Sequence, residues 1–489
     1  MHFPKIMFVI ITQIFNYILA TGHYPESFKT GIMIFIPKPG KDLSHPKNYR
    51  PITLINIIAK CFGKIINKRF VSYLETNALL NPLQYGFRKG RGCAGSLALI
   101  YELIARQKGT IYKHDMSVVS RDISGAFDRV WHNKLIELFD KIRPPLDPLF
   151  IKILTSFLKN RQIRIKVNSF IGPSFTPTAG VPQGAPESPD TFNITTLPFD
   201  EYQPSPNTYA PWYCDDLHLV VTTPVGLRNR QRHPGELRRA IINQNNFEKK
   251  RGILTCPEKS IITTIGKTVP GSLRVDDGES IVQYPYLQPQ ATTKILGLHI
   301  TGYSFTARHC HEISKRARAY LSQMKGLRHL SIKGKTQLTK SFILTTLTYP
   351  CIPLNTCSIS RLYQLQRVQN DAIRWIYNVN FTQRITNREL HHRANLLPIN
   401  QIIHSRARIL WEKLSAGIAG DQESFERISN IEVTHYYKNF PSSYDISLKE
   451  DPPPIYNPED CQSQAVKDFY SHAPDDPNVN YDDDPDDPP

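Results

Sequence analysis

The stretch Tyr213-Cys-Asp-Asp216, followed by the apolar run Leu217-His-Leu-Val-Val221, decides which fold the sequence predicts. Two adjacent carboxylates between short segments of β-forming residues predict a hairpin whose turn carries the acids. Such a turn offers oxygen ligands where nothing apolar packs, and a divalent cation could bind there. Pairs of aspartates are also common in solvated turns, so this stretch alone leaves both interpretations open.

The composition indicates a large, basic protein. The chain has 489 residues, which is enough for two to four domains, and a formal net charge of +17. The segment from Glu450 to Pro489 holds 12 acidic residues and one lysine, so the part before it is more basic than the total. A basic body is typical of proteins that bind a polyanion such as nucleic acid, although a basic solvated surface has the same composition.

Cysteine usage and hydropathy indicate an intracellular protein of the nucleus or cytoplasm without a membrane span. The eight cysteines show no Cys-x-x-Cys pattern, which favours reduced thiols over a disulfide framework or a zinc site. The apolar run from Ile6 to Ala20 is interrupted by Gln13 and Asn16 and is too short to cross a bilayer. We expect it to form a buried helix.

Periodicity predicts a mixture of helices and strands, followed by a helical region. The expected helices cover 6–19, 55–74, 97–105, 126–139 and 236–250, and most of 321–414. The expected strands cover 31–36, the region of 118–122, 261–265 and 295–300. From residue 441 onward proline and aspartate dominate, which predicts a disordered tail.

Asp122 lies at the end of a predicted strand, where it can complete a site with the hairpin acids. Carboxylates from two neighbouring strands can hold two Mg²⁺ ions for phosphoryl transfer. Taken alone, Asp122 is equally explained as an acid that caps a strand.

Nine short motifs in a fixed order make the chain resemble the reverse transcriptase of non-long-terminal-repeat retrotransposons, most closely those of the Jockey type. The motifs are Ile36-Pro-Lys-Pro-Gly-Lys41, Asn48-Tyr-Arg-Pro-Ile-Thr-Leu54, Gln84-Tyr-Gly-Phe-Arg88, Asp122-Ile-Ser-Gly-Ala-Phe-Asp-Arg-Val-Trp-His132, Gly180-Val-Pro-Gln-Gly184 with Ser188-Pro189 and Phe192-Asn-Ile194, Tyr213-Cys-Asp-Asp216, Pro257-Glu-Lys259, Leu296-Gly297, and Leu365-Gln-Arg-Val-Gln-Asn370. The resemblance runs from about Pro25 to Ile300 and more loosely to Leu414.

The resemblance implies an α+β chain with the right-hand polymerase fold of fingers, palm and thumb. Fingers and palm are expected in residues 1–300, a helical thumb in 301–430, and a disordered acidic tail in 431–489. The implied activity is RNA-directed DNA polymerisation, in which a DNA primer is extended on an RNA template from deoxynucleoside triphosphates. The family's upstream endonuclease domain is not in this sequence, which suggests a truncated copy.

The resemblance also assigns the metal site. Asp122 and Asp215 are expected to bind two Mg²⁺ ions together with the main-chain carbonyl of Ile123, and Asp216 to act as the supporting catalytic acid.

Further positions are implied to bind the nucleotide. Lys38 and Arg50 are expected to contact the triphosphate, while Gln183 and Gly184 line the pocket. Phe127 is expected to be the steric gate that excludes a ribose 2′-hydroxyl; as a residue alone it could equally be part of a helix core.

Two more assignments follow from the resemblance. Lys259 is expected to steady or protonate the leaving pyrophosphate, although a surface lysine explains it as well. The turn Leu296-Gly297 is expected near the primer terminus, and the basic helices after Leu321 would hold the template–primer backbone.

Some positions depart from the family pattern and motivate an alternative. Ala185-Pro-Glu187 and Asp190-Thr191 stand where the family has mostly apolar residues, and they are expected to disturb the helix behind the nucleotide pocket. Arg121 brings a charge into the strand beside Asp122, while Cys214 is a mild replacement for alanine. The alternative is a decayed relic that binds nucleic acid without efficient polymerisation, and a basic nucleic-acid-binding scaffold is a third interpretation.

Overall fold

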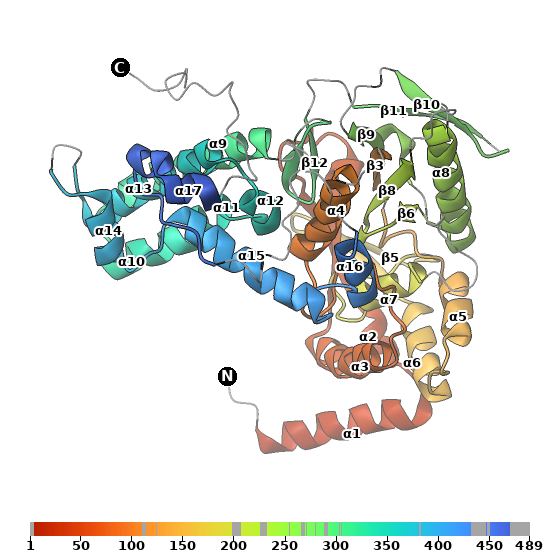
Figure 1. The fold of residues 1–489 in the computed structure, drawn as a ribbon. Coiled ribbons are helices and arrows are strands. Elements are labelled where there is room, and N and C mark those ends of the chain that lie inside the picture. The colour runs from red at the N-terminus through yellow and green to blue at the C-terminus, as the bar shows by residue number, and fades with distance from the viewer. Residues whose placement is uncertain are drawn as a thin grey trace.

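The computed structural model describes residues 4–109, 114–123, 125–197, 207–224, 232–253, 255–265, 269, 271–278, 280–287, 292–302, 304, 306–380, 383–431, 446 and 450–469. The fold combines two larger sheets and two hairpins with helices that gather in two regions (Figure 1). Ser124 and the predicted disordered tail of residues 475–489 lie outside the described residues.

The strands form two larger sheets and two separate hairpins. One sheet has the order β2-β1-β4-β5, and the other has the order β6-β8-β3-β9 with β7 also paired to β8. The bounds are β1 Thr30–Pro37, β2 Tyr49–Ile55, β3 His114–Asp122, β4 Gln162–Val167, β5 Phe170–Phe175, β6 Thr208–Tyr209, β7 Trp212–Tyr213, β8 Asp216–Pro224, β9 Ile261–Ile265, β10 Ser272–Asp276, β11 Ile281–Pro285, β12 Thr293–Ile295 and β13 Leu298–Ile300.

The helices divide into those around the sheets and those of the carboxyl-terminal region. The first group is α1 Lys5–Thr21, α2 Glu26–Lys29, α3 Ile57–Thr76, α4 Cys93–Lys108, α5 His132–Lys141, α6 Pro148–Leu158, α7 Ser188–Thr195 and α8 Arg232–Arg251. The second is α9 Ala307–Met324, α10 Ile332–Leu338, α11 Thr345–Leu347, α12 Cys351–Asn355, α13 Ile359–Tyr377, α14 Asn387–Ala394, α15 Ile399–Ser415, α16 Gln422–Ser429 and α17 Gln464–Phe469.

Strand β3 lies in the middle of the larger sheet and is buried on both faces. Val119 belongs to a core shared with Leu219 of β8 and with α3, α5, α6, α7 and α8. Val118 faces the opposite way, into a second core shared with Val220, α4 and α16. A strand covered on both sides reads as a continuous apolar run, which is why Val118 and Val119 both fit a strand interior. The two covering layers fix the end of β3, where Asp122 lies.

Helices α9–α15 form a third core that lies to one side of the sheets (Figure 1). Helix α13 is central to it, with Leu365, Val368 and Ile376 fully buried. Residues 450–469 pack onto this core through Ile455, Cys461 and Val466 and include α17. They fall within the segment 431–489 for which we expected disorder, and their burial explains why this part is ordered instead.

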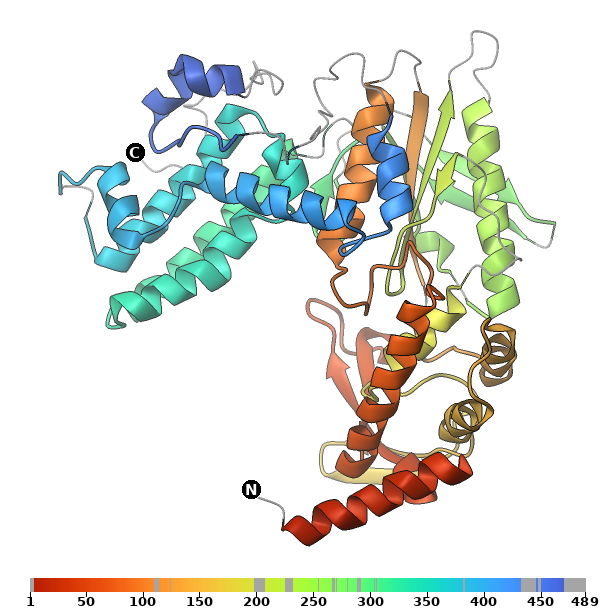
Figure 2. The ribbon, with the colours of Figure 1, turned by 60° about the horizontal axis from the view of Figure 1, so that its bottom comes forward.

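Helix α1 forms as expected but is not buried as expected. It ends at Gly22, which has a left-handed backbone (φ 67°) and caps the carbonyl of Ile18. Ile18 is its one buried residue, whereas Ile6 and Phe8 are exposed. Figure 2 shows the helix (red) at the end of the molecule remote from the larger sheet. None of the helices in the described part of the chain is long and apolar enough to cross a membrane.

Two predicted elements differ from those observed. The helix expected from Ala126 begins at His132, because residues 125–129 form a turn in which Gly125 has a φ of 61°. The strand expected at 295–300 is a hairpin of β12 and β13, because Leu296 and Gly297 both have positive φ angles and reverse the chain.

Candidate active site at the β7–β8 hairpin

The hairpin predicted from Tyr213–Asp216 is present, and its turn lies beside the end of β3. Tyr213 of β7 pairs with Asp216 of β8, which leaves Cys214 and Asp215 as the two turn residues. Cys214 has a φ of 57°, as the first position of a type I′ or II′ turn requires. Asp122 is directly opposite Asp216 in the antiparallel pairing of β3 with β8. The structure therefore brings together the three acids that the sequence singled out.

Gln84 holds the hairpin turn in place. Its side chain accepts a hydrogen bond from the Cys214 amide (3.0 Å) and donates one to the Cys214 carbonyl (3.2 Å). The same side chain accepts a third hydrogen bond from the Gly86 amide (2.8 Å), and it is fully buried. Gly86 must be a glycine here, because a Cβ atom would lie 2.2 Å from the Cys214 nitrogen. The sequence motif that contains Gln84 was recognised, but nothing in it indicated this function.

Replacing Gln84 with alanine is expected to destabilise the fold by roughly 2–4 kcal/mol, since a buried side chain with three hydrogen bonds to the main chain is lost. The turn that carries Asp215 would also lose its support, so we expect the rate of any reaction that depends on this carboxylate to fall on the order of 100-fold. Urea unfolding and single-turnover kinetics measure the two effects. Gln162→Ala removes an exposed glutamine with surface hydrogen bonds and should change neither; a similar loss in both variants would contradict the role of Gln84.

The three carboxylates repel one another and are partly withdrawn from water. Burial raises the pKa of Asp215, and the neighbouring Asp122 raises it further, while Arg50 acts in the opposite direction. Burial, Asp215 and Asp122 together raise the pKa of Asp216 to about 6. A cluster of anions that is costly to charge is stabilised by a bound cation, so the chemistry of these donors suits a divalent metal ion. As they lie among the described residues, however, the three side chains do not form a group that could hold a metal ion.

Asp122, Asp215 and Asp216 form an acid cluster, and Lys259 provides a positive charge within it. Its ammonium group lies 2.6 Å from Oδ2 of Asp122, and this ion pair raises the pKa of Lys259. The side chain of Lys259 is largely exposed, at 64%, and that of Asp122 is partly exposed, at 38%. An exposed ion pair contributes little to stability, so Lys259 can leave Asp122 when a metal ion competes for the carboxylate. The amide of Cys256 also donates to the Asp122 carbonyl and fixes the end of β3.

The neighbouring Ile123 is fixed by its main chain. It forms a β-bridge with Thr255, and its side chain is buried in the core. Ile123 directly follows Asp122, and the role of its main-chain carbonyl as a metal ligand stays a prediction.

Of the residues predicted to bind the nucleotide, Arg50 lies on β2, while Gln183 and Gly184 lie on the loop before α7. Arg50 is on β2, close enough to Asp215 to lower its pKa. Gln183 donates a hydrogen bond to Asp128 (3.0 Å), and its main-chain carbonyl accepts one from the Thr53 amide (2.7 Å). Lys38 directly follows β1, and its ammonium group donates to the carbonyl of Lys47 (2.8 Å).

Gly184 allows its loop to approach strand β2. Its φ is 124°, and a Cβ atom would lie 2.7 Å from the main-chain oxygen of Thr53. A larger residue would therefore push the loop away from the strand that carries Arg50.

Phe127 is partly buried between two other aromatic rings. It stacks on Phe192 of α7, with ring centroids 5.3 Å apart, and meets Phe87 edge to face at 6.0 Å. Phe127 packs against the core while part of it stays exposed, and its role as a steric gate stays a prediction.

The helix behind the pocket forms despite the unusual residues before it. Pro189 lies in the first turn of α7, where proline needs no amide partner. Asp190 accepts a hydrogen bond from Asn67 of α3 (2.8 Å), and burial raises its pKa to about 6. Glu187 is 3% exposed, and burial raises its pKa to about 7. The expected disturbance is thus confined to the cost of burying these acids, while the helix itself is retained.

The charge of Arg121 is compensated. Its guanidinium group lies 2.9 Å from Glu248 of α8 and also donates to Asn245 and Thr255. The buried arginine beside Asp122 therefore belongs to an ion pair, but its Nε and Nη1 atoms are buried without a hydrogen-bond partner among the described residues, so part of the expected cost remains.

A family model described as reverse transcriptase (RNA-dependent DNA polymerase) matches residues 36–300, which contain all the residues of this site. The chain belongs to the reverse transcriptase family. The right-hand polymerase fold predicted from the motifs is thereby confirmed, and so is the implied metal dependence of the family in general terms.

Relatives of this reverse transcriptase are encoded by mobile elements of insects. A probable RNA-directed DNA polymerase from transposon X-element of Drosophila melanogaster is 26% identical over 84% of this chain and 44% of the relative. The RNA-directed DNA polymerase from mobile element jockey of Drosophila funebris is 30% identical over 40% of this chain and 20% of the relative. The predicted resemblance to Jockey-type elements is thus confirmed, and the chain spans less than half the length of these relatives.

Among solved structures, telomerase from Candida albicans in complex with a fragment of telomeric RNA is similar over 93% of this reverse transcriptase and 72% of that chain. The identity is 10% and the TM-score 0.45.

Proposed function

We propose that this chain is an RNA-directed DNA polymerase that extends the 3′-hydroxyl of a DNA primer on an RNA template. The observation that carries the proposal is the register of β3 and β8, which sets Asp122 opposite Asp216 with Asp215 in the adjoining turn. Its substrates would be deoxynucleoside triphosphates. The basic composition of the body fits a template–primer duplex held by its phosphates.

Asp122, Asp215 and the carbonyl of Ile123 would hold two Mg²⁺ ions. When bound, these ions lower the pKa of the primer hydroxyl and neutralise charge on the leaving pyrophosphate. Asp216 supports the pair from the opposite strand; burial, and after it the charges of Asp215 and Asp122 that the ions would neutralise, raise its pKa to about 6.

The remaining site residues would bind and orient the nucleotide. Arg50 would contact the triphosphate with its guanidinium fork, and Lys38 would do so after leaving the Lys47 carbonyl. Gln183 and Gly184 would line the pocket. Lys259, released from Asp122, would donate a proton to the leaving pyrophosphate or hold it in place.

Primer extension on poly(rA)–oligo(dT) tests the proposal, with Asp215→Ala as the inactive control. Incorporation well above that of Asp215→Ala supports polymerase activity. Retention of template–primer with no more incorporation than the control would instead favour the decayed relic, for which the buried acid Glu187 beside the nucleotide pocket is the supporting observation.

Replacing Phe127 with valine is expected to weaken discrimination against ribonucleotides, because the smaller side chain leaves room for a 2′-hydroxyl group. Relief of a clash worth about 1–3 kcal/mol raises the efficiency of ribonucleotide relative to deoxynucleotide incorporation on the order of 10- to 100-fold. The ratio of kcat/KM values for UTP and dTTP measures it. Phe87→Leu removes a ring that meets Phe127 edge to face and avoids a β-branched residue at the positive φ of this position, so an equal change in that variant would show that aromatic packing and not a gate sets the ratio.

A further inference from the structure

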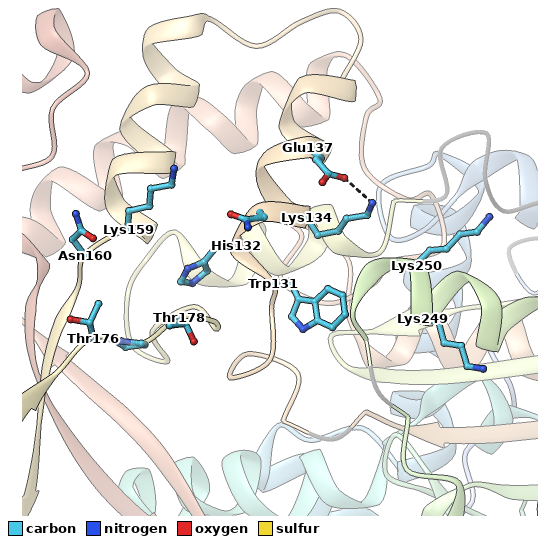
Figure 3. Close-up of a pocket in the computed structure, with 12 residues that line it drawn as sticks. Trp131, His132, Lys134, Glu137, Lys159, Asn160, Thr176, Thr178, Lys249 and Lys250 are labelled. Carbon is cyan, nitrogen blue, oxygen red and sulfur yellow. Dashed lines mark hydrogen bonds and ion pairs between the residues drawn. The ribbon is translucent and has the colours of Figure 1, made fainter. Parts of the chain in front are cut away.

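A basic pocket is lined by residues of α5 and α8 and of the segments next to β4 and β5 (Figure 3). Helices α5 and α8 lie on the side of the larger sheet opposite the α9–α15 helices (Figure 1). The pocket has a volume of about 760 Å³ and is bounded by the start of α5, the turn between α6 and β4, the segment after β5 and the end of α8. Acid cluster residues are not among those that line it. The pocket is therefore separate from the proposed polymerase site.

Positive charge dominates the lining of this pocket. Four lysines reach it, namely Lys134, Lys159, Lys249 and Lys250, against the single carboxylate of Glu137 (Figure 3). Lys134 is paired with Glu137 at 2.7 Å, and Lys249 with Asp277 at 3.0 Å. Lys159 and Lys250 are exposed and make no ion pair within the part of the chain that the structure describes. Two cationic groups are thus available to an anionic ligand.

Trp131 adds a flat aromatic surface between these lysines. Its side chain is 54% exposed, whereas the three other tryptophans, Trp212, Trp375 and Trp411, are buried. The ring is supported from one side by Gly252, where a Cβ atom would come within 2.6 Å of the indole. An indole held in this way loses little conformational freedom when a planar group stacks on it.

The pocket is connected to the loop that lines the nucleotide site. Trp131 forms a β-bridge with Ala179, and Nε2 of His132 lies 2.8 Å from the carbonyl of Gly180. Arg161 also donates to that carbonyl. The base of the pocket and the Gly180–Gly184 loop are therefore parts of one packed unit.

Exposed aromatic rings flanked by cationic side chains are the means by which proteins bind unpaired nucleic-acid strands, since bases stack and phosphates pair with the cations. We propose that this pocket is a second nucleic-acid site, which binds an unpaired stretch of RNA with one base on Trp131 and phosphates on Lys159 and Lys250. In taking the strand to be RNA, the proposal rests on the proposed function. An RNA held here would be anchored outside the polymerase site.

Tryptophan fluorescence of the full chain tests this site directly, because Trp131 is the exposed indole. The probe is a ten-residue oligo(rU), added to protein already saturated with a blunt RNA–DNA hairpin that occupies the polymerase site. We expect saturable quenching that disappears in Trp131→Phe. The double variant Lys159→Glu with Lys250→Glu should raise the Kd at least tenfold and reduce the salt dependence of binding.

The matched control is Lys5→Glu with Lys64→Glu, which makes the same change in net charge at two exposed lysines outside the pocket. This control variant should bind oligo(rU) with a Kd within twofold of that of the unmodified chain. If both double variants bound oligo(rU) equally weakly, overall charge would explain the effect and the proposal would be overturned. Thermal unfolding of all variants checks that they fold. If AMP quenched the fluorescence at the same concentration as oligo(rU), the pocket would be a mononucleotide site, and the proposal would also be overturned.

Two readouts separate this proposal from the polymerase assignment. Primer extension on a short template should be unchanged by the double variant at Lys159 and Lys250, and Asp122→Asn should retain the quenching. A chain that extends primers but shows no quenching by oligo(rU) would contradict only the second nucleic-acid site. A chain that shows quenching but does not extend primers would contradict only the polymerase assignment.

Discussion

Replacing Asp122 with asparagine is expected to lower the rate of primer extension by at least about three orders of magnitude, which corresponds to roughly 4 kcal/mol of lost transition-state stabilisation. The amide keeps the shape of the side chain but removes the negative charge that faces Asp216 across the β3–β8 pair. Stability should hardly change, because Asp122 is paired with Lys259 at an exposed position. Single-turnover extension at saturating Mg²⁺ measures the loss.

Asp140→Asn is the matched control, since Asp140 is exposed on α5 and lies outside the acid cluster. It should extend primers at the rate of the unmodified chain. Binding of template–primer should be unchanged in both variants, because phosphate contacts and not Asp122 would hold the duplex. Activity of Asp122→Asn within tenfold of the unmodified chain would mean that Asp122 is not a metal ligand, and the proposed mechanism would have to be abandoned.

The sequence predicted the acid cluster well because local rules act on it strongly. A two-residue turn between β-forming segments can place Asp215 in only a few ways, and the strand ending at Asp122 buries Val119 on one face and Val118 on the other. The order of the motifs then supplied what spacing could not, namely that β3 and β8 are neighbours although about 90 residues separate Asp122 from Asp215.

Long-range contacts were the features that the sequence could not reveal. Arg121 looked like an uncompensated charge because its partner Glu248 is 127 residues away, and no local pattern connects the two. Gln84 acts on a turn 130 residues further along the chain. The exposure of α1 has the same cause, since its apolar run shows that a helix can be buried but not whether a neighbouring element covers it.

Replacing Glu187 with glutamine is expected to stabilise the protein by up to about 3 kcal/mol at pH 8 and by less than about 1 kcal/mol at pH 5. Burial raises the pKa of Glu187 from its ordinary value of 4.5 to about 7, so the folded chain holds a proton that the unfolded chain has already released. Folding therefore loses stability as the pH rises from about 4.5 to about 7, and above pH 7 the full penalty remains. Glutamine keeps the size of the side chain and cannot lose a proton in this range.

Urea unfolding at pH 5, 6, 7 and 8 measures the free energies of unfolding of Glu187→Gln and of the unmodified chain. The difference between the two values cancels the contributions of other buried groups such as Asp190. Glu412→Gln, at an exposed position on α15, should show no comparable pH-dependent gain.

Since Glu187 lies between Gly184 and the first residue of α7, its charging acts on the segment that lines the nucleotide pocket. Primer extension at pH 8 should then rise in Glu187→Gln if the buried charge impairs the pocket. Equal unfolding free energies of Glu187→Gln and the unmodified chain at pH 8 would show that the carboxylate is solvated or paired in solution, and this departure from the family pattern would no longer support a decayed enzyme.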